Sequence, residues 1–449
     1  MKEITLSEIL EAREHRVAVQ QELLHRHRKS LICFTMNIPG PVKLTPLIAR
    51  GFRDGCRALL HSLEDENIPV MHWAATETPT GCEAFCIADA DAQKLKSIAV
   101  SIEDGSSVGR LFDMDVLTPD GQKLTRDRVG GKSRDCIVCG APGQGCASRR
   151  AHSVPELQAA TNRLLTEHFA RADAERYAHL AVQSLLEEVH TTPKPGLVDD
   201  RNTGSHKDMD VATFETSAHA LRPYFAECFR IGHQTASLPP ADTFPGLRAA
   251  GLEAEKAMYC ATFGVNTHKG VIYSMGILCG ALGRLWRADD PAVSLPRLLE
   301  ECRQIVSESA ASDLAAGGET AGLQLYRAKG LPGIRGEAAA GFPSVANIGL
   351  PAFRDALAKG LDRDRAGVIA LLHLIAEVED TNLYHRGGED GAAFARQQAA
   401  ALLPYPARQQ LEELDDTFIS RNLSPGGCAD LLAITYFLDS LEKSFRDGQ

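Results

Sequence analysis

The sequence predicts a two-domain protein in which an N-terminal α+β domain is followed by an all-α helical domain. The chain has 449 residues, which is more than a single hydrophobic core usually serves. Before about Arg150, short β-rich runs alternate with segments of helical periodicity, whereas strand patterns almost vanish after Val154. The long segments that follow are rich in alanine and leucine at helical spacing, which is typical of a helical domain.

In the first domain, apolar residues recur at helical spacing over residues 6–28 and 47–63, and residues 30–36 have an extended pattern. Residues 98–102, 111–118 and 123–126 predict strands. The tetrad Thr118-Pro119-Asp120-Gly121 has the residues that a tight turn prefers, so it predicts a hairpin between the last two strands. We expect Cys82 and Cys86 to pack on a helix.

In the second domain, residues 156–187, 212–230, 271–287, 297–316, 365–379 and 429–443 predict helices. Pro239-Pro240 and Pro291 predict loops between them. No stretch rich in glycine, proline or serine separates the two domains, so we expect a helix to join them. We place the first domain at residues 1–155, a helical linker at 156–176 and the second domain at 177–449.

Composition excludes several classes of protein. A formal net charge of −11 argues against nonspecific nucleic-acid binding, which needs a basic surface. No apolar stretch approaches the roughly 20 residues that span a bilayer, so we expect no membrane segment. The N-terminus Met1-Lys2-Glu3-Ile4 has no apolar core like that of a signal peptide. Twelve cysteines in such a chain predict reduced thiols and a cytoplasmic protein.

Four polar segments interrupt the second domain. The first follows a helical pattern over residues 177–189, and its prolines and glycines prevent the helix from continuing. The four segments are Thr192-Pro193-Lys194-Pro195-Gly196-Leu197-Val198-Asp199 with Asn202, Gly204, His206 and Asp208; Gly264-Val265-Asn266-Thr267-His268-Lys269-Gly270; Asp380-Thr381-Asn382 with Arg386-Gly387-Gly388-Glu389; and Arg421-Asn422-Leu423-Ser424-Pro425-Gly426-Gly427 with Asp430. We expect them to converge at one end of the helical domain.

In this order and spacing, the four segments resemble the triphosphoribosyl-dephospho-CoA synthase family, which makes the prosthetic-group precursor of citrate lyase. The resemblance runs from about Tyr177 to the C-terminus and includes Thr320-Ala321-Gly322, Arg335-Gly336-Glu337 and Gly341-Phe342-Pro343. It implies that ATP and 3'-dephospho-CoA give 2'-(5''-triphosphoribosyl)-3'-dephospho-CoA and adenine. No Gly-x4-Gly-Lys-Ser/Thr motif occurs, so a P-loop does not hold the ATP.

The N-terminal third looks like the holo-citrate lyase synthase family. The similar motifs are Ala12-Arg13-Glu14, Asn37-Ile38-Pro39-Gly40-Pro41-Val42-Lys43, Gly109-Arg110-Leu111-Phe112-Asp113-Met114-Asp115-Val116 and Arg134-Asp135-Cys136-Ile137-Val138-Cys139. This resemblance implies transfer of the phosphoribosyl-dephospho-CoA group to a serine of the citrate lyase acyl carrier (gamma) subunit, with release of pyrophosphate. Such carriers are usually acidic, so docking needs a local basic patch, for which His25-Arg26-His27-Arg28-Lys29 and Arg149-Arg150 are candidates.

Asp113 and Asp115 are two residues apart on a predicted strand, so they share a face. Two adjacent carboxylates favour a divalent cation between them, and we expect Mg²⁺, which neutralises charge during phosphoryl transfer. With Gly105-Ser106 upstream, the layout is similar to that of the nucleotidyltransferase superfamily, although acidic residues beside a hairpin are common in unrelated proteins. We expect Lys43, Arg110 and Arg134 to bind phosphates.

The spacing Cys136-x2-Cys139-x6-Cys146-x5-His152 leaves two interpretations open. A zinc site uses these residue types, but the spacing is irregular and a second Cys-x2-Cys is absent from the sequence. The pattern favours separate thiols beside a glycine-rich turn.

Displacement at an anomeric carbon needs phosphate ligands, a carboxylate near the developing cation and a donor at the leaving base. We expect Lys194, Lys269 and Arg386 to bind phosphate, with backbone N–H groups at Gly387 and Gly388. The candidate metal or base carboxylates are Asp199, Asp208, Asp380, Glu389 and Asp430, with Asp380 as the expected metal ligand and Asp199, Asp208, Glu389 and His206 as expected catalytic residues. Asn202, Asn266 and His268 suit hydrogen bonds to ribose or adenine. Which carboxylate is the base is left open, as are simple capping roles for Asp380 and Asp430 and a packing role for His268.

Two alternatives to the citrate lyase hypothesis stay open. The same chemistry serves malonate decarboxylase, but the transferase-like motifs around Asn37 and Asp113 favour citrate lyase. A non-catalytic helical scaffold that binds a carrier has no need of polar residues in glycine-rich loops, so the sequence argues against it.

Overall fold

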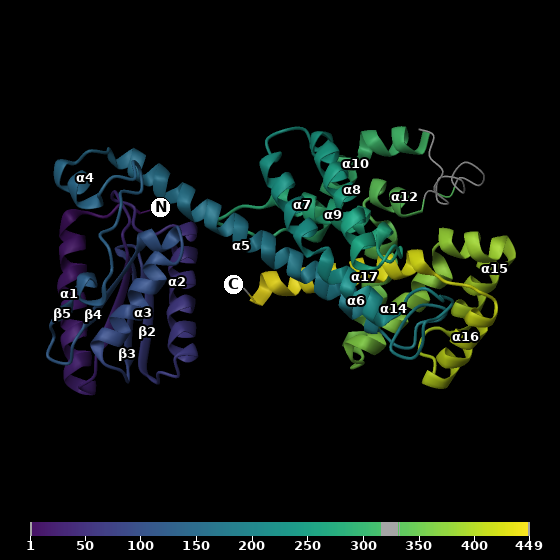
Figure 1. Ribbon diagram of the computed structural model, residues 1–449, viewed down its shortest axis with the longest axis horizontal. Helices are drawn as coiled ribbons and strands as arrows, with labels where there is room; N and C mark the ends of the chain where they lie inside the picture. Colours follow the sequence, from purple (N-terminus) through teal and green to yellow (C-terminus); the bar gives the residue numbers. More distant parts are fainter. Residues whose placement is uncertain (1, 316–330, 332, 448–449) are drawn as a thin grey trace. The chain divides into compact units, whose positions relative to one another are not determined.

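The computed structural model describes residues 2–315, 331 and 333–447. The chain divides into two compact units, one of Met1–Ala170 with Ala288–Asp290 and one of Arg171–Arg287 with Pro291–Gln449 (Figure 1). The first unit is α/β and the second is mostly helical, as the sequence predicts. Among the described residues, no helix is both long enough and apolar enough to cross a membrane.

The first unit contains a five-stranded antiparallel sheet with the order β2-β3-β1-β4-β5. The strands are β1 (Leu31–Met36), β2 (Val70–Thr78), β3 (Gly81–Ala88), β4 (Phe112–Leu117) and β5 (Lys123–Leu124). The helices are α1 (Leu6–His27), α2 (Pro46–Asp65), α3 (Ala92–Asp104), α4 (Gly143–Arg149) and the first part of α5 (Val154–His190), with short 3-10 turns η1 (Val108–Leu111) and η2 (Arg126–Val129).

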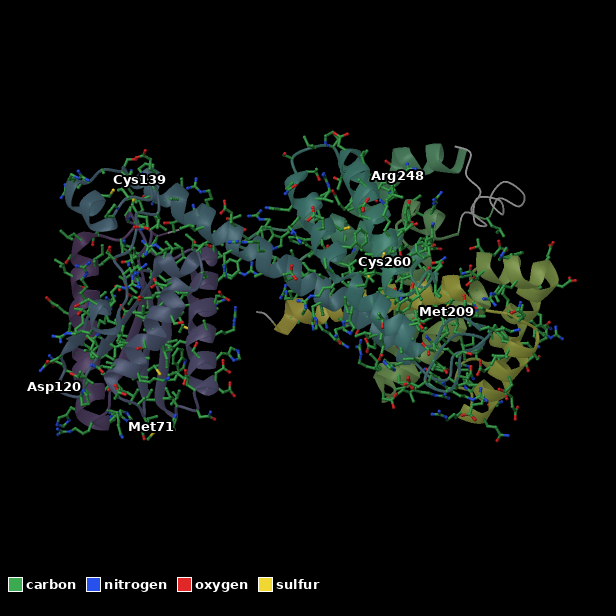
Figure 2. All side chains as sticks on the ribbon, viewed as in Figure 1. Met71, Asp120, Cys139, Met209, Arg248 and Cys260 are labelled. Atoms are coloured by element: carbon green, nitrogen blue, oxygen red, sulfur yellow. The ribbon has the colours of Figure 1, made fainter. Side chains whose placement is uncertain are left out.

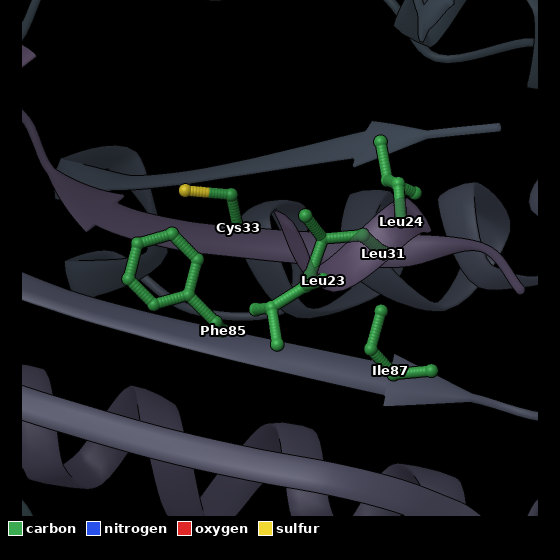
Figure 3. Packing of buried hydrophobic residues seen from close by; sticks show 6 residues of the cluster. All are labelled: Leu23, Leu24, Leu31, Cys33, Phe85 and Ile87. Atoms are coloured by element: carbon green, nitrogen blue, oxygen red, sulfur yellow. The ribbon is translucent and has the colours of Figure 1, made fainter. Parts of the chain in front are cut away.

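Helix α1 covers one face of the sheet and α2 and α3 cover the other (Figure 1). Beneath α1, the cluster of Leu23, Leu24, Leu31, Cys33, Phe85 and Ile87 is buried (Figure 3). The opposite face packs Phe34 against Phe52 of α2, with ring centroids 5.1 Å apart. Because residues alternate along a strand, the face that receives α1 also carries the odd-numbered residues of β4.

The predicted helices at residues 6–28 and 47–63 and the predicted strands at 30–36 and 111–118 are confirmed. The strand predicted at 123–126 is present at Lys123–Leu124 only, because η2 begins at Arg126. The turn Thr118–Gly121 is confirmed as well, with a hydrogen bond of 2.8 Å from Gly121 N to Thr118 O. The strand predicted at residues 98–102 is wrong: these residues belong to α3, where Asp91 caps the backbone N–H groups of Gln93 and Lys94. The helix predicted around Cys82 and Cys86 is also wrong, because both lie on β3.

The second unit contains the rest of α5 and the helices α6 (Val211–Ala220), α7 (Arg222–Gln234), α8 (Phe244–Ala261), α9 (Lys269–Leu285), α10 (Leu295–Ala315), α12 (Gly333–Ala339), α13 (Leu350–Ala358), α14 (Arg363–Glu377), α15 (Thr381–Leu402), α16 (Arg408–Ser420) and α17 (Gly426–Asp447). The short helix η3 (Pro240–Thr243) precedes α8, and a π-helical turn η4 (Val345–Gly349) precedes α13. Helix α9 is buried along most of its length and packs on α7, α8 and α10.

The predicted helices at residues 156–187, 271–287, 365–379 and 429–443 are confirmed, and the helix predicted at 297–316 matches α10 as far as Ala315. The single helix predicted over 212–230 is two helices, because α7 begins at Arg222, with Pro223 in its first turn, after a break at Leu221. The segment from Thr381 to Glu389, treated as a loop, is the start of α15, which is kinked at Gly388 (φ 63°). The Thr320-Ala321-Gly322 motif lies outside the described residues.

Candidate functional sites

In the first unit, Asp113 and Asp115 lie side by side on the face of β4 that points toward α1. Thr35 of β1 pairs with both Asp113 and Glu83, so three strands place these residues in one row. Arg16 of α1 donates to Glu83 Oε1 from Nε at 2.9 Å. Burial, and then the neighbouring Asp115, raise the pKa of Asp113, while Lys123 bonds Asp115 Oδ2 at 2.6 Å. A divalent cation would relieve this repulsion, so the pair fits a Mg²⁺ site.

Arg134 lies close to this acidic pair, and Arg110 lies close to Arg134. The guanidinium of Arg134 donates to Phe112 O at 2.6 Å and forms an ion pair with the buried Glu103. Glu103 also accepts from the N–H of Met114 at 2.8 Å, so it fixes the strand that carries both aspartates. Arg110 donates to the carbonyl of Asp135, and burial and the nearby Arg134 lower its pKa. Two arginines that repel each other beside two aspartates favour a polyphosphate ligand.

The segment from Asn37 to Lys43 forms a separate loop. The ammonium of Lys43 donates to the carbonyl of Ile38, and burial and Arg13 lower its pKa. Gly40 has a φ of 82°, and an added Cβ would meet Gln158 Nε2 of α5 at 2.5 Å. This position therefore favours glycine for its backbone conformation.

In the second unit, the four polar segments meet. We call this place the loop junction, formed by residues 194–208, 264–270, 380–389 and 421–430. Arg386 Nη2 donates to His206 Nδ1 at 3.2 Å, and His206 Nε2 lies 3.0 Å from Ser424 Oγ. Because Nδ1 accepts from a guanidinium, the imidazole is neutral, and burial and Arg386 lower its pKa. The predicted convergence of Arg386, His206 and the last segment is therefore present.

Lys194 is buried in this junction rather than open to solvent. Its side chain is 1% exposed, and its ammonium forms an ion pair with Glu188 and donates to Glu188 O at 2.6 Å. Burial raises the pKa of Glu188, and Lys194 opposes that rise. Glu188 lies near the end of α5, within the helical pattern of residues 177–189, and nothing in that pattern marks it as a partner. The sequence therefore did not identify Glu188 as the partner of Lys194.

Replacing Lys194 with methionine should destabilise the second unit by about 3–5 kcal/mol, because it leaves the buried Glu188 without its partner. Adding Glu188→Gln should recover much of that loss. Urea unfolding of the second unit measures both effects. Lys269→Met is the matched control, since Lys269 forms a more exposed ion pair with Glu255, and this change should have little effect. Equal losses in the two single variants would contradict the buried-pair interpretation.

Asp199 and Asn202 organise the first segment. The carboxylate of Asp199 accepts from the backbone N–H groups of Lys194, Arg201 and Asn202, at 2.7, 2.8 and 3.1 Å. The amide of Asn202 donates to Asp415 Oδ2 at 2.7 Å, and Asp415 also accepts from Gly196 N at 2.9 Å. Asp415 comes from the middle of α16, where its spacing gives no sign of this role.

Asp380 and Asp430 differ in how their carboxylates are used. Asp380 is buried and accepts from the N–H groups of Asn382 and Leu383 at the start of α15, and from Cys428 N at 2.8 Å. Asp430 is half-buried, and an added Cβ on Gly270 would lie 1.9 Å from its Oδ2. Burial, and then Glu188 and Asp380, raise the pKa of Asp430 well above its usual range. A carboxylate of this kind suits proton transfer.

His268 is buried at the start of α9. Thr267 donates to Ser217 Oγ at 2.7 Å, and Ser217 Oγ lies 2.7 Å from His268 Nδ1. That chain leaves the proton of His268 on Nε2, which is buried and has no hydrogen-bond partner in the described part of the chain. Burial, and then Lys194, lower the pKa of His268 to about 3. The imidazole is therefore a neutral donor at neutral pH.

The pKa of His268 predicts a pH effect on stability. Its folded value of about 3 lies below the ordinary 6.5, so the stabilisation is complete above pH 6.5 and decreases as the pH falls. Each pH unit below 6.5 should cost about 1.4 kcal/mol, or roughly 2 kcal/mol at pH 5. His268→Gln should unfold with a flatter pH dependence between pH 6.5 and 4.5, measured by urea titration. His61→Gln, at an exposed position of α2, should keep the wild-type slope.

The remaining predicted residues surround the junction. Asp208 and Asn266 are exposed, and Lys269 forms an ion pair with Glu255 at 2.8 Å. Glu389 is exposed next to Gly388, while the preceding Gly387 packs against Leu423.

A separate cavity of about 650 Å³ lies between α5, α14 and α17, lined by His190 and Arg363, and contains none of the predicted site residues.

Comparison with known proteins assigns both parts of the chain. A family profile described as CitG, ATP:dephospho-CoA triphosphoribosyl transferase, matches residues 174–449, and one described as CitX, apo-citrate lyase phosphoribosyl-dephospho-CoA transferase, matches residues 4–168. A Haemophilus influenzae relative, "Protein CitXG", is 35% identical over 97% of this chain and 96% of its own length. The chain belongs to the CitXG family.

Other relatives match the whole chain or about two thirds of it. "Protein CitXG" of Leuconostoc mesenteroides subsp. cremoris is 31% identical over 98% of this chain and 97% of its own length. A Pectobacterium atrosepticum protein named 2-(5''-triphosphoribosyl)-3'-dephosphocoenzyme-A synthase is 44% identical over 63% of this chain and 95% of its own length. The chain is therefore a bifunctional transferase, with the apo-citrate lyase transferase domain before the triphosphoribosyl-dephospho-CoA synthase domain.

Proposed function

We propose that the two reactions of this chain occur at two separate sites, one at the loop junction and one at Asp113 and Asp115. We assign residues 1–155 to the transferase and 177–449 to the synthase, with residues 156–176 as a helical linker that the first unit partly buries at Leu165 and Phe169. The observation that carries the synthase assignment is the hydrogen-bonded chain from Arg386 through His206 to Ser424, which joins three segments far apart in sequence.

At the loop junction, the 2'-hydroxyl of 3'-dephospho-CoA attacks the anomeric carbon of the ATP ribose, and adenine leaves. Arg386 and Lys269 are the half-buried cations among the described residues of this junction, whereas Arg201, Lys207 and Arg421 are exposed, so we assign the triphosphate to Arg386 and Lys269. Lys194 contributes by fixing Glu188 rather than by direct contact. His268, whose Nε2 proton lacks an acceptor in the described residues, is suited to hydrogen-bond the departing adenine.

We assign Asp430 as the group that accepts the proton of the attacking hydroxyl. The oxygens of Asp199 and Asp380 already accept backbone N–H groups, whereas the Asp430 carboxylate approaches α9 at Gly270. Burial raises the pKa of both Asp380 and Asp430, and the pKa of Asp430 is well above its usual range. Asp208 and Glu389 are exposed at the rim, where contact with ribose or phosphate is their proposed role. A Mg²⁺ bound here would neutralise triphosphate charge, and Asp380 or Asp430 would hold it.

Replacing Asp430 with asparagine should reduce adenine release by about 100-fold to 10,000-fold, the usual contribution of a general base. The rate of the wild-type enzyme should fall as the pH drops below the pKa of Asp430, and the residual activity of the variant should lose that acidic limb. Adenine measured by chromatography across pH gives both quantities. An unchanged rate, or an acidic limb that persists in the variant, would exclude Asp430 as the base.

At the second site, the carrier serine attacks a phosphorus of the triphosphoribosyl intermediate, and pyrophosphate leaves. We propose a nucleotidyltransferase-like arrangement in which Asp113 and Asp115 hold Mg²⁺, and Arg110, Arg134 and Lys43 contact phosphates. Mg²⁺ would stabilise charge on the phosphate oxygens and the leaving pyrophosphate. For the acidic carrier, Arg149 and Arg150 are the better docking candidates, because Arg26 and Lys29 already pair with Glu22 and Asp89.

The proposal is tested by incubating the apo carrier subunit of citrate lyase with ATP, 3'-dephospho-CoA and this protein. Intact-protein mass spectrometry should show the added prosthetic group, and chromatography should show one adenine released for each group attached. The carrier of malonate decarboxylase, tested in parallel, separates the alternative partner. Absence of adenine release and of any mass increase would support a non-catalytic scaffold. We further propose a reducing cytoplasmic setting, consistent with twelve cysteines that are all free.

A further inference from the structure

Four candidate metal ligands come together at one end of the first unit. The sulfur atoms of Cys136, Cys139 and Cys146 and a ring nitrogen of His152 all lie within 4.8 Å of one another. Cys139 Sγ is 3.5 Å from Cys146 Sγ and 3.3 Å from His152 Nε2. Figure 2 shows Cys139 in this region of the unit, near α4. A disulfide is absent, since its sulfur atoms would be about 2.05 Å apart.

We infer that these four residues bind a structural Zn²⁺ ion. Three thiolates and one imidazole are a common ligand set for structural zinc, which takes four ligands in a tetrahedron. With bonds of about 2.3 Å to sulfur and 2.1 Å to nitrogen, tetrahedral ligand atoms are roughly 3.5–3.8 Å apart. The 3.5 and 3.3 Å separations observed are close to that spacing.

The backbone of residues 135–142, around Cys136 and Cys139, forms a tight turn of the kind that binds metal ions, which we call the knuckle. Asp135 and Pro142 form an antiparallel bridge, and Cys136 N donates to Ala141 O at 2.7 Å. Gly140, with a φ of 70°, closes the turn by donating to Cys136 O at 2.9 Å. The N–H of Val138 points to Cys136 Sγ at 3.5 Å, as expected for a backbone group that supports a thiolate ligand.

Packing alone does not explain this arrangement. Cys146 is the only buried side chain among those described between residues 130 and 153, and Cys139 is exposed. Separate thiols that behave as small hydrophobes would be buried in a core, which this segment does not have. A segment of defined shape with so little buried apolar surface needs a cross-link, and a metal ion supplies one.

The proposed zinc site would hold the knuckle, α4 and the start of α5 together. Cys136 and Cys139 come from the knuckle, Cys146 from α4, and His152 directly precedes the Ser153 cap of α5. The knuckle also contacts both arginines near the acidic pair. Gly143 N donates to Arg134 O at 2.9 Å, and Arg110 donates to Asp135 O. Only this positioning of Arg110 and Arg134 as phosphate ligands rests on the proposed function; the zinc site does not.

Metal analysis tests the zinc site directly. The full-length protein is purified in buffer with a chelator that removes loosely bound ions. Elemental mass spectrometry should then show about one zinc ion per chain. Cys139→Ser and His152→Ala should each reduce that content at least fivefold. Matched controls at exposed positions, Cys260→Ser (labelled in Figure 2) and His61→Ala, should retain the full content. Protein grown with Co²⁺ should show the visible absorption of a tetrahedral thiolate site.

Three results would overturn the inference: wild-type protein without zinc, iron in place of zinc, or equal zinc in Cys139→Ser and wild type. The link to the transferase is measured separately. With a ready-made triphosphoribosyl intermediate, Cys139→Ser should modify the carrier at least tenfold more slowly, with adenine release unchanged. Stoichiometric zinc that is lost in Cys139→Ser without a change in transferase rate would keep the zinc site and reject its role in positioning Arg110 and Arg134.

Discussion

Asp113→Asn or Asp115→Asn should abolish modification of the carrier while adenine release from ATP continues at the wild-type rate. The two carboxylates share a strand face, and burial and Asp115 raise the pKa of Asp113, so each is placed to hold a cation at a polyphosphate. Loss of a metal ligand removes several kcal/mol of transition-state stabilisation, which corresponds to at least about a 1000-fold loss. Mass spectrometry of the carrier, with the intermediate supplied ready-made, measures it.

Asp113→Asn has a second expected property. It removes a negative charge that burial and the neighbouring Asp115 disfavour, so the first unit should unfold at the same or a higher temperature than in wild type. Asp65→Asn, at an exposed position near the end of α2, is the control and should modify the carrier normally. If adenine release fell together with carrier modification in a folded Asp113 variant, the two activities would not be independent.

Arg386→Ala should reduce adenine release by about 100-fold or more. This side chain contacts Ser205 O at 2.9 Å, Asn422 Oδ1 at 3.0 Å and His206 Nδ1, so it joins three segments and presents charge at their junction. A loss mostly in kcat would indicate contact with the transition state, whereas a loss mostly in KM would indicate uniform binding of ATP. Initial rates of adenine formation over a range of ATP concentrations separate the two.

We expect the Arg386→Ala variant to retain its transferase activity. Carrier modification from the ready-made intermediate should be unchanged in Arg386→Ala, because Asp113 and Asp115 belong to the other unit. Arg408→Ala, at an exposed position of α16, should leave adenine release intact. Normal adenine release by Arg386→Ala would remove the loop junction from the active site. Lys194→Ala is a weaker test, since losing the partner of buried Glu188 also destabilises the fold.

Segments with one dominant local pattern were predictable from sequence. The hairpin at Thr118–Gly121 and the long helices of the second unit follow directly from turn chemistry and periodicity. Residues 98–102 were not, because a β-branched run lies inside a helix that Asp91 begins and whose buried face packs on β4. Strand β2 was missed because most of its residues are polar or exposed, and it gains its order by pairing with β3.

The candidate sites were likewise predictable in part. Residue types and spacing were sufficient to predict that Asp113 and Asp115 share a face and that Arg386 and His206 meet. Residue types and spacing could not distinguish a charged side chain that is available to bind a ligand from one that already has a partner within the protein. Lys194 and Asp199 look like ligands in the sequence, yet Glu188 and backbone N–H groups use them in the fold. That distinction depends on partners distant in sequence or hidden within helical patterns.

The 37 residues of α5 belong to both units, since the division at residue 170 falls inside this one helix. Leu165 and Phe169 are buried on one side of the division, and Tyr177 and Leu185 on the other. A gene fragment that ends at residue 155 would therefore remove the part of α5 that the first unit buries. Fragments divided near residue 170 keep those side chains, but the shorter one still lacks Ala288, whose carbonyl accepts from Arg50 at 3.0 Å. Neither division therefore yields a complete first unit on its own. To study the two enzymes as separate fragments, both fragments should be co-expressed, so that the residues missing from one are present in the other.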